Sequence, residues 1–189
     1  MQLSTKIRVM RVLFFIVVGV IFIGCATVSY VKPIKPSKTP SPDQAYLYGR
    51  FKFTKKYSSL RLAIGLTNLS SKEELNIRFS EGSGIAVIGV SPGKYQVTHK
   101  IVAVLGASEK QESSNTPFLS PVLSEPFNVK PGNAYYIGDY FGWTKFGKLG
   151  IFRTTFKGDI ERSENNFEQT TREFKSEYPN FSKMASVSP

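Results

Sequence analysis

The alternation of apolar and polar residues between Ala45 and about Phe156 most constrains how this chain can fold. In the stretch 60–68, leucine or isoleucine occupies each even position up to 66, and the stretch 75–79 repeats the pattern at odd positions. A two-residue period predicts strands that bury one face. The stretch 85–90 is apolar at almost every position, which is typical of a strand covered on both faces. We therefore expect about eight short, antiparallel strands.

Two Pro-Gly pairs, Pro92–Gly93 and Pro131–Gly132, each stand shortly before a tyrosine-led strand. Proline presets φ at the second residue of a turn, and glycine accepts the positive φ that a type II turn then needs. We expect a tight turn at both places. The polar stretch 107–121 is expected to form a longer loop between strands.

The pattern changes after Gly158. Asn165 followed three residues later by Glu168 predicts a helix start, and Pro179 is expected to end the helix. Phe167, Phe174 and Tyr178 would share the face that docks on the sheet. The last residues, 182–189, are expected to fray.

A resemblance follows from the order of these motifs. Between Ala86 and Tyr140, a strand, Pro-Gly-Lys-Tyr, a second strand and Phe-x-Val-x-Pro-Gly-x-x-Tyr-Tyr-Ile follow one another. This order resembles small β-sandwich modules of exported bacterial proteins, including PEGA-like, carboxypeptidase-regulatory-like and DUF2846-like modules. The resemblance implies a mainly β, antiparallel prealbumin-like β-sandwich and gives no catalytic residues to carry over.

The N-terminus has the composition of a secretory signal. Its first eleven residues contain three basic residues and no acidic one, and the apolar run Val12–Ile23 follows. The run ends in Ile23-Gly24-Cys25, which resembles the lipobox of bacterial lipoproteins, although Phe22 departs from the usual Leu or Val. The resemblance implies that Cys25 is lipidated and that residues 1–24 are removed. Ala26, where an Asp would favour inner-membrane retention, implies the outer membrane.

An uncleaved signal anchor is the competing interpretation. From Val12 to Val31 there is no charged residue, and such a run of twenty residues is long enough to cross about 30 Å of hydrocarbon as a helix. The small residues around Cys25 favour cleavage. Both interpretations place the remainder of the chain outside the cytoplasm, because the basic N-terminus stays inside.

Composition also predicts the domain boundaries. Residues 30–43 hold four prolines and three lysines and are expected to be extended. The predicted parts are a signal peptide at 1–24, a lipid-anchored Pro/Lys-rich tether at 25–43, a β-sandwich at 44–158, and a C-terminal helix and tail at 159–189.

Catalysis and cofactors are not expected. One Cys and one His exclude an intrachain disulfide and a Cys/His zinc centre within the chain. His99 shares its alternation with Tyr95, Val97 and Ile101, so we expect it on the apolar face of its strand. A hydrolase built around His99 is the weakest alternative.

The aromatic and basic stretch 135–148 is the most suggestive segment for ligand binding. Six aromatic residues and two lysines occur there, and Tyr140, Trp143 and Lys145 are the candidate ligand-binding residues. Aromatic rings can stack on sugars while ammonium groups meet anionic substituents. The structural alternative is a hairpin whose aromatic residues fill the sandwich core.

Charge suggests the partners. The chain carries +11, and removing the three basic residues of the signal leaves +8. For an exported protein this favours anionic envelope material over nucleic acid. We therefore expect a non-enzymatic lipoprotein of the cell envelope that acts as a structural or protein-interaction module, attached to the membrane by its N-terminal lipid. The alternative is a lipoprotein that binds glycan or peptidoglycan through the aromatic and basic patch.

Overall fold

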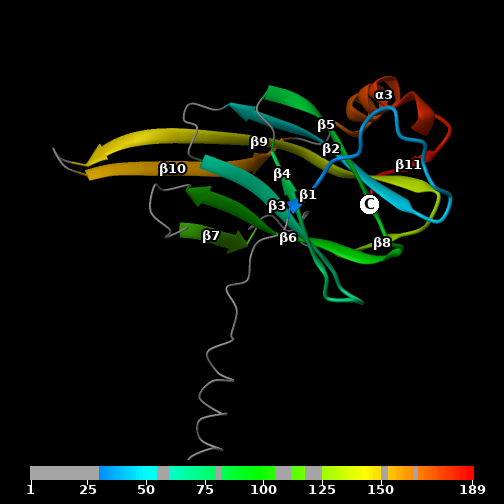
Figure 1. Ribbon diagram of the computed structural model, residues 1–189, viewed down its shortest axis with the longest axis horizontal. Helices are drawn as coiled ribbons and strands as arrows, with labels where there is room; N and C mark the ends of the chain where they lie inside the picture. The colour runs from blue at the N-terminus through cyan, green and yellow to red at the C-terminus, as the bar shows by residue number, and fades with distance from the viewer. Residues whose placement is uncertain are drawn as a thin grey trace, which may run out of the picture.

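The computed structural model describes residues 30–54, 60–79, 82–104, 112–117, 125–149, 153–163 and 166–189. The fold is mainly β, with two mixed sheets that face each other and one described α-helix (Figure 1). Residues 1–29, with Cys25 and the predicted signal, lie outside the described residues.

The first sheet, sheet A, has the strand order β1-β4-β3-β6-β7, and β8 also pairs with β6. Its strands are β1 (Tyr30–Val31), β3 (Leu60–Asn68), β4 (Glu74–Arg78), β6 (Gly93–Val104), β7 (Glu112–Pro117) and β8 (Phe127–Val129).

The second sheet, sheet B, has the order β10-β9-β2-β5, and β11 also pairs with β9. Its strands are β2 (Ala45–Thr54), β5 (Gly82–Val90), β9 (Asn133–Leu149), β10 (Arg153–Arg162) and β11 (Ala185–Val187). The helix α3 (Phe167–Glu177) and the short 3-10 helix η1 (Pro179–Phe181) lie between β10 and β11 in sequence.

The expectation of purely antiparallel sheets is wrong. β1 pairs with β4, β2 with β9 and β11 with β9 in parallel. Parallel neighbours need a long crossover, and the long stretch of chain between β2 and β9 provides one. The described residues also form more strands than the eight expected, because segments predicted to be tether, loop or tail pair with the sheets.

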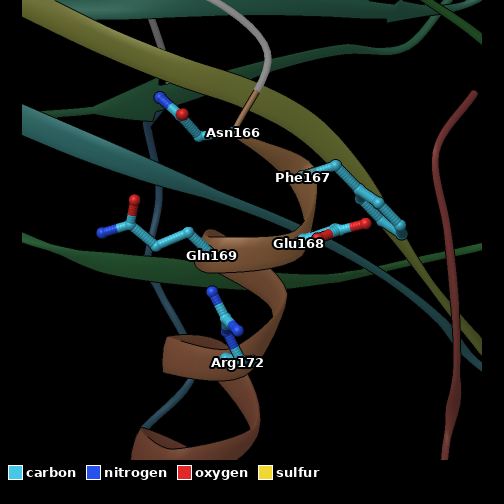
Figure 2. Close-up of a pocket in the computed structure, with 5 residues that line it drawn as sticks. All are labelled: Asn166, Phe167, Glu168, Gln169 and Arg172. Carbon is cyan, nitrogen blue, oxygen red and sulfur yellow. The ribbon is translucent and has the colours of Figure 1, made fainter.

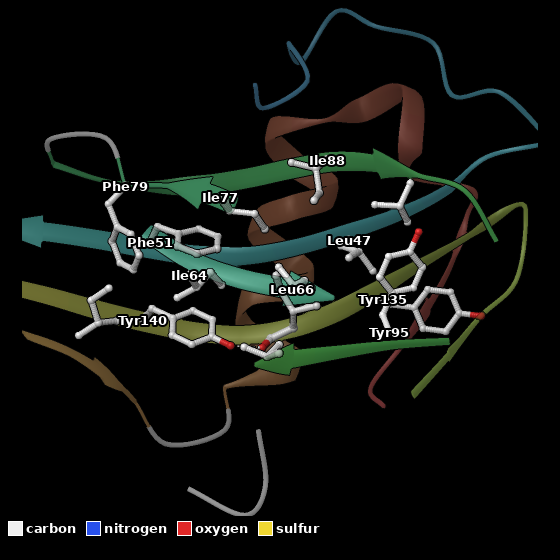
Figure 3. Packing of buried hydrophobic residues seen from close by; sticks show 14 of the residues in the cluster. Leu47, Phe51, Ile64, Leu66, Ile77, Phe79, Ile88, Tyr95, Tyr135 and Tyr140 are labelled. Carbon is white, nitrogen blue, oxygen red and sulfur yellow. Dashed lines mark hydrogen bonds between the residues drawn. The ribbon is translucent and has the colours of Figure 1, made fainter. Parts of the chain in front are cut away.

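The alternation in the sequence correctly identified the core face of β3 and β4. Leu62, Ile64 and Leu66 of β3 and Ile77 of β4 lie in the main cluster between the two sheets (Figure 3). Tyrosine and phenylalanine rings fill much of the remaining space there. Because each of these side chains removes a large apolar area from water, this cluster is the main source of the stability of the fold.

The outer face of sheet B is covered as well. Tyr46, Tyr48 and Val87 form a second cluster with Phe174 of α3 and Phe181 of η1. The rings of Tyr48 and Phe174 stack with centroids 4.3 Å apart. The prediction that β5 is buried on both faces is confirmed, and so is the docking of the helix through an aromatic face.

A β-bulge in β9 exchanges the two faces of that strand. Tyr48 pairs with Tyr136, but the next residue, Gly49, pairs with Gly138, which leaves Ile137 as the extra residue. Gly138 has φ +119°, a conformation that glycine adopts without steric cost. Residues of even number face outward before the bulge and inward after it.

Residues 30–43 belong to the folded body and do not form a free tether. Tyr30–Val31 is a strand of sheet A, and the Ile34 amide donates a hydrogen bond to the Val87 carbonyl oxygen at 2.7 Å. Ile34 also packs on the second cluster. A proline-rich composition predicted extended backbone but could not show that the extended backbone lies against the sheets.

Three smaller expectations also need correction. Residues 112–117, expected in a loop, form β7, and residues 185–187, expected to fray, form β11. The turn at Gly132 has the expected positive φ of 74°, but Gly93 is absent from the described glycines with positive φ and already belongs to β6. Pro92–Gly93 therefore does not form the type II turn that its sequence suggests.

Candidate functional site

Tyr140, one of the three candidate binding residues, lies in the core. It is 1% exposed, stacks on Phe51 with ring centroids 5.5 Å apart, and donates a hydrogen bond to the Ile137 carbonyl oxygen at 2.7 Å (Figure 3). Burial raises the pKa of its hydroxyl well above the usual value near 10. The bulge at Ile137 turns position 140 inward, so Tyr140 cannot present its ring to a ligand.

Trp143 lies on the opposite face of the same strand. Its ring is partly exposed, and its Nε1–H donates to Glu161 Oε1 at 3.0 Å. Phe141 shares this outer face by alternation, and the Lys52 Nζ lies 5.9 Å from the centre of its ring. We name Lys52, Phe141, Trp143 and Glu161 the outer strip. Phe141, rather than the candidate Tyr140, is therefore the second aromatic residue beside Trp143 on this face.

Lys145 continues the strand beyond the outer strip. The pairing of β9 with β2 ends where Trp143 meets Thr54, and from Thr144 to Leu149 the described partner of β9 is β10 alone. We name residues 144–149 and 153–158 the arm. Figure 1 shows the arm as a two-stranded ribbon that reaches beyond the other strands. Lys145 lies in the arm, directly opposite Lys157.

A buried polar cluster, here called the Asp139 cluster, fixes α3 to the outer face of sheet B. Asp139 is 3% exposed, and the Thr170 hydroxyl reaches its two carboxylate oxygens at 3.0 and 2.9 Å. Arg50 Nη1 lies 3.7 Å from Asp139 Oδ2, and Arg50 Nη2 forms an ion pair with Glu173 Oε2 at 2.6 Å. A buried carboxylate needs such partners to remain charged at acceptable cost.

Two residues border the Asp139 cluster. Burial, and secondly the Asp139 carboxylate, raise the pKa of Tyr136 to about 12. The Arg162 guanidinium lies against Gly138, where an added Cβ would come within 2.8 Å of its Nε. These contacts hold the helix over the bulge, so the cluster is explained by helix docking.

An open recess of about 460 Å³ lies at the first turn of α3 (Figure 2). Asn166, Phe167, Glu168, Gln169 and Arg172 line it. Glu168 and Arg172 are exposed and stand four residues apart on the helix. The side chain of Asn166 makes no capping hydrogen bond to the helix. The recess brings together none of the candidate residues from the sequence.

His99 is not on the core face. Gly65 pairs with His99 and Leu66 with Val97, so Thr98 is an extra residue that exchanges the faces of β6. The His99 Nδ1 is hydrogen-bonded to the Thr98 hydroxyl at 2.9 Å, and its ring lies against the backbone of Gly65. No carboxylate is among the hydrogen-bond partners of His99 in the described part of the chain.

Neither family models nor curated proteins give a match to this chain. The resemblance to PEGA-like and DUF2846-like modules therefore stays a prediction. Among the helices within the described ranges, none combines the length and the apolar character that a membrane span requires.

Proposed function

We propose that this chain is a lipid-anchored protein of the bacterial cell envelope whose β-sandwich binds a partner without catalysing a reaction. The observation that carries the proposal is the position of Cys25, the one cysteine of the chain, directly after a basic segment and an apolar run. Several acyl chains on one N-terminal cysteine would make attachment to the bilayer effectively permanent.

Gly24, Ala26 and Thr27, the small residues around Cys25, favour cleavage before the cysteine. Ala26 favours the outer membrane, and the prealbumin-like type of the sandwich belongs to the same proposal.

Binding is proposed because the accessible aromatic and basic groups lie together. The outer strip combines Lys52, Phe141 and Trp143, and the arm continues from it with further basic residues. By contrast, the buried acid of the sandwich, Asp139, is occupied by Thr170 and Arg50. An envelope protein or an anionic surface suits the strip and the arm better than a small reactive substrate.

Mass spectrometry of the membrane fraction tests the anchor. We expect the mature protein to begin at Cys25 and to carry a diacylglyceryl group. The Cys25→Ala variant should retain residues 1–24. A wild-type chain that keeps its first 24 residues and carries no lipid would instead establish the signal-anchor interpretation.

Glycan or peptidoglycan binding is the second candidate, and the partly exposed ring of Trp143 is the observation that favours it. Burial of Tyr140 removes one of the three residues first assigned to this function. Co-sedimentation with purified cell-wall sacculi tests the remainder. Loss of sedimentation in Trp143→Ala, with wild-type behaviour in Phe127→Ala, would support this candidate over protein or lipid partners.

A further inference from the structure

The arm is unusually basic for its length. Lys145, Lys148, Arg153 and Lys157 lie in it, and the sequence contains no acidic residue between Asp139 and Asp159. Each strand of the arm has six residues, so the ribbon is about 20 Å long. A positive charge of four is therefore concentrated on a narrow projection from the body.

The strand register increases the electrostatic cost of this charge. Lys145 and Lys157 stand directly opposite each other across β9 and β10. Like charges at opposed positions destabilise a strand pair, and a two-stranded ribbon is only marginally stable in water. An anionic partner would remove this repulsion, so the arm gains stability when such a partner is bound.

The outer strip gives the root of the arm an amphipathic character. Trp143 and Phe141 are partly exposed on the face where Lys52 lies, and alternation continues this face to positions 145 and 157. Tryptophan prefers the level of the lipid headgroups, and lysine and arginine pair with headgroup phosphates. This combination fits a bilayer surface better than a flexible anionic polymer.

The distance to the anchor is short. Five residue steps separate Cys25 from Tyr30, which span at most about 17 Å. Tyr30 belongs to β1, which lies beyond β4 and β3 from β6 in sheet A. The short anchored segment therefore holds the body, and with it the arm, near the bilayer.

We infer that the arm binds anionic phospholipid headgroups of the bilayer that carries the chain's own lipid anchor. This inference rests on the proposed function, because the anchor brings the arm close to that bilayer. The arm then fixes the orientation of the sandwich on the membrane, while the acyl chains supply the attachment.

Hydrogen exchange of the arm amides tests the inference. The full chain is placed in nanodiscs of phosphatidylcholine alone or of phosphatidylcholine mixed with phosphatidylglycerol. We expect exchange in the arm to slow about tenfold or more in the mixed nanodiscs. The slowing should disappear in about 0.5 M salt, because salt screens exposed charges.

A matched pair of variants separates arm charge from total charge. Replacing Lys145, Lys148, Arg153 and Lys157 by Gln should abolish the slowing. The control replaces four exposed lysines, Lys72, Lys94, Lys130 and Lys183, by Gln. Lys94 pairs with Asn128 of β8, Lys130 follows β8, Lys183 precedes β11 and Lys72 lies between β3 and β4. In Figure 1, β8 and β11 lie at the end of the body away from the arm, so loss of these lysines should leave the slowing unchanged.

Flotation of the same samples measures attachment through the lipid anchor independently of the arm. A chain that floats with neutral lipid in high salt, yet shows no slowing in the arm, would overturn the inference and leave the anchor intact. A chain that does not float, but whose arm slows with phosphatidylglycerol, would overturn the anchor alone. Equal slowing in neutral nanodiscs, or slowing by soluble teichoic acid but not by lipid, would also overturn headgroup binding.

Discussion

Replacing Thr170 by Val probes how much the Asp139 cluster stabilises the fold. Thr170 is fully buried, and its hydroxyl reaches both Asp139 oxygens, at 3.0 and 2.9 Å. Valine keeps the shape but removes the donor, and the Arg50 guanidinium remains 3.7 Å from Asp139 Oδ2. A hydrogen bond to a buried charged group contributes about 1.5–3 kcal/mol, so we expect a loss of about 2 kcal/mol in unfolding free energy.

The single tryptophan provides the assay. Trp143 lies in β9, four residues after Asp139, and its fluorescence in detergent-solubilised chain reports unfolding of sheet B in urea. The control is Thr171→Val, which removes one neutral hydrogen bond of 2.7 Å between Thr171 and the Tyr48 hydroxyl. Because Thr171 is only partly buried, we expect the control to cost about 1 kcal/mol or less.

A double-mutant cycle decides whether the charge of Asp139 is responsible. In an Asp139→Asn background, the Thr170→Val substitution should cost about 1 kcal/mol less than in the wild-type chain, because no buried carboxylate loses its donor. Equal costs of the Thr170 substitution in the two backgrounds would refute the reasoning. The same conclusion would follow if Thr170→Val and Thr171→Val had the same effect.

Three further predictions follow from backbone geometry and burial. Gly138→Ala should lower the unfolding free energy by about 1–3 kcal/mol in the same urea assay, because φ is +119° and the Cβ would crowd Arg162, and an unchanged midpoint would contradict this. Gly65→Ala should displace the ring of His99 from the strand and shift its imidazole resonances in NMR spectra; unshifted resonances would exclude the contact. The pKa of the Tyr136 hydroxyl is raised to about 12, so this hydroxyl loses its proton at lower pH in the unfolded chain than in the folded one. The unfolding free energy should therefore fall as pH rises from about 10 to 12, and it should fall less in Tyr136→Phe. Equal pH profiles of the two chains over that range would contradict the prediction.

Alternation predicted burial well where strands are regular. Leu62, Ile64 and Leu66 occupy the core positions that their spacing indicates, and the continuous apolar stretch in β5 is covered on both faces. The helix was also predictable, since Phe174 and Tyr178 both lie in the cluster on sheet B. In each case the pattern is local, and nothing distant has to be known to assign the face.

A bulge misled this reasoning in β6, and a second bulge decides the face of Tyr140 in β9, a residue whose face alternation was not used to predict. One extra residue at Thr98 turns His99 away from the core, and one at Ile137 places Tyr140 in the core. Counting in steps of two assigns the wrong face to each position beyond a bulge. Gly138 was the available signal for the second bulge, since a glycine within an apolar strand often marks one.

Segments outside the strong periodic pattern were the hardest to predict. Strand β1 and strand β11 contain two and three residues, too few for a two-residue period to be recognised. Their pairing depends on β4 and β9, which are distant in sequence. The Asp139 cluster has the same origin, because Thr170 and Asp139 are brought together only by helix docking.

The strand register shows that two basic residues of the arm are neighbours, which composition alone does not show. In the sequence, Lys145 and Lys157 are two basic residues among 25 and are separated by a stretch that could form any hairpin. The pairing of Phe146 with Phe156 sets them opposite each other, beyond the last residue of β2 that supports the sheet. A shift of one residue in one strand would place the two lysines on opposite faces and remove most of the repulsion. An arm under such repulsion, at the end of an otherwise well-packed sheet, is best explained by a partner with negative charge.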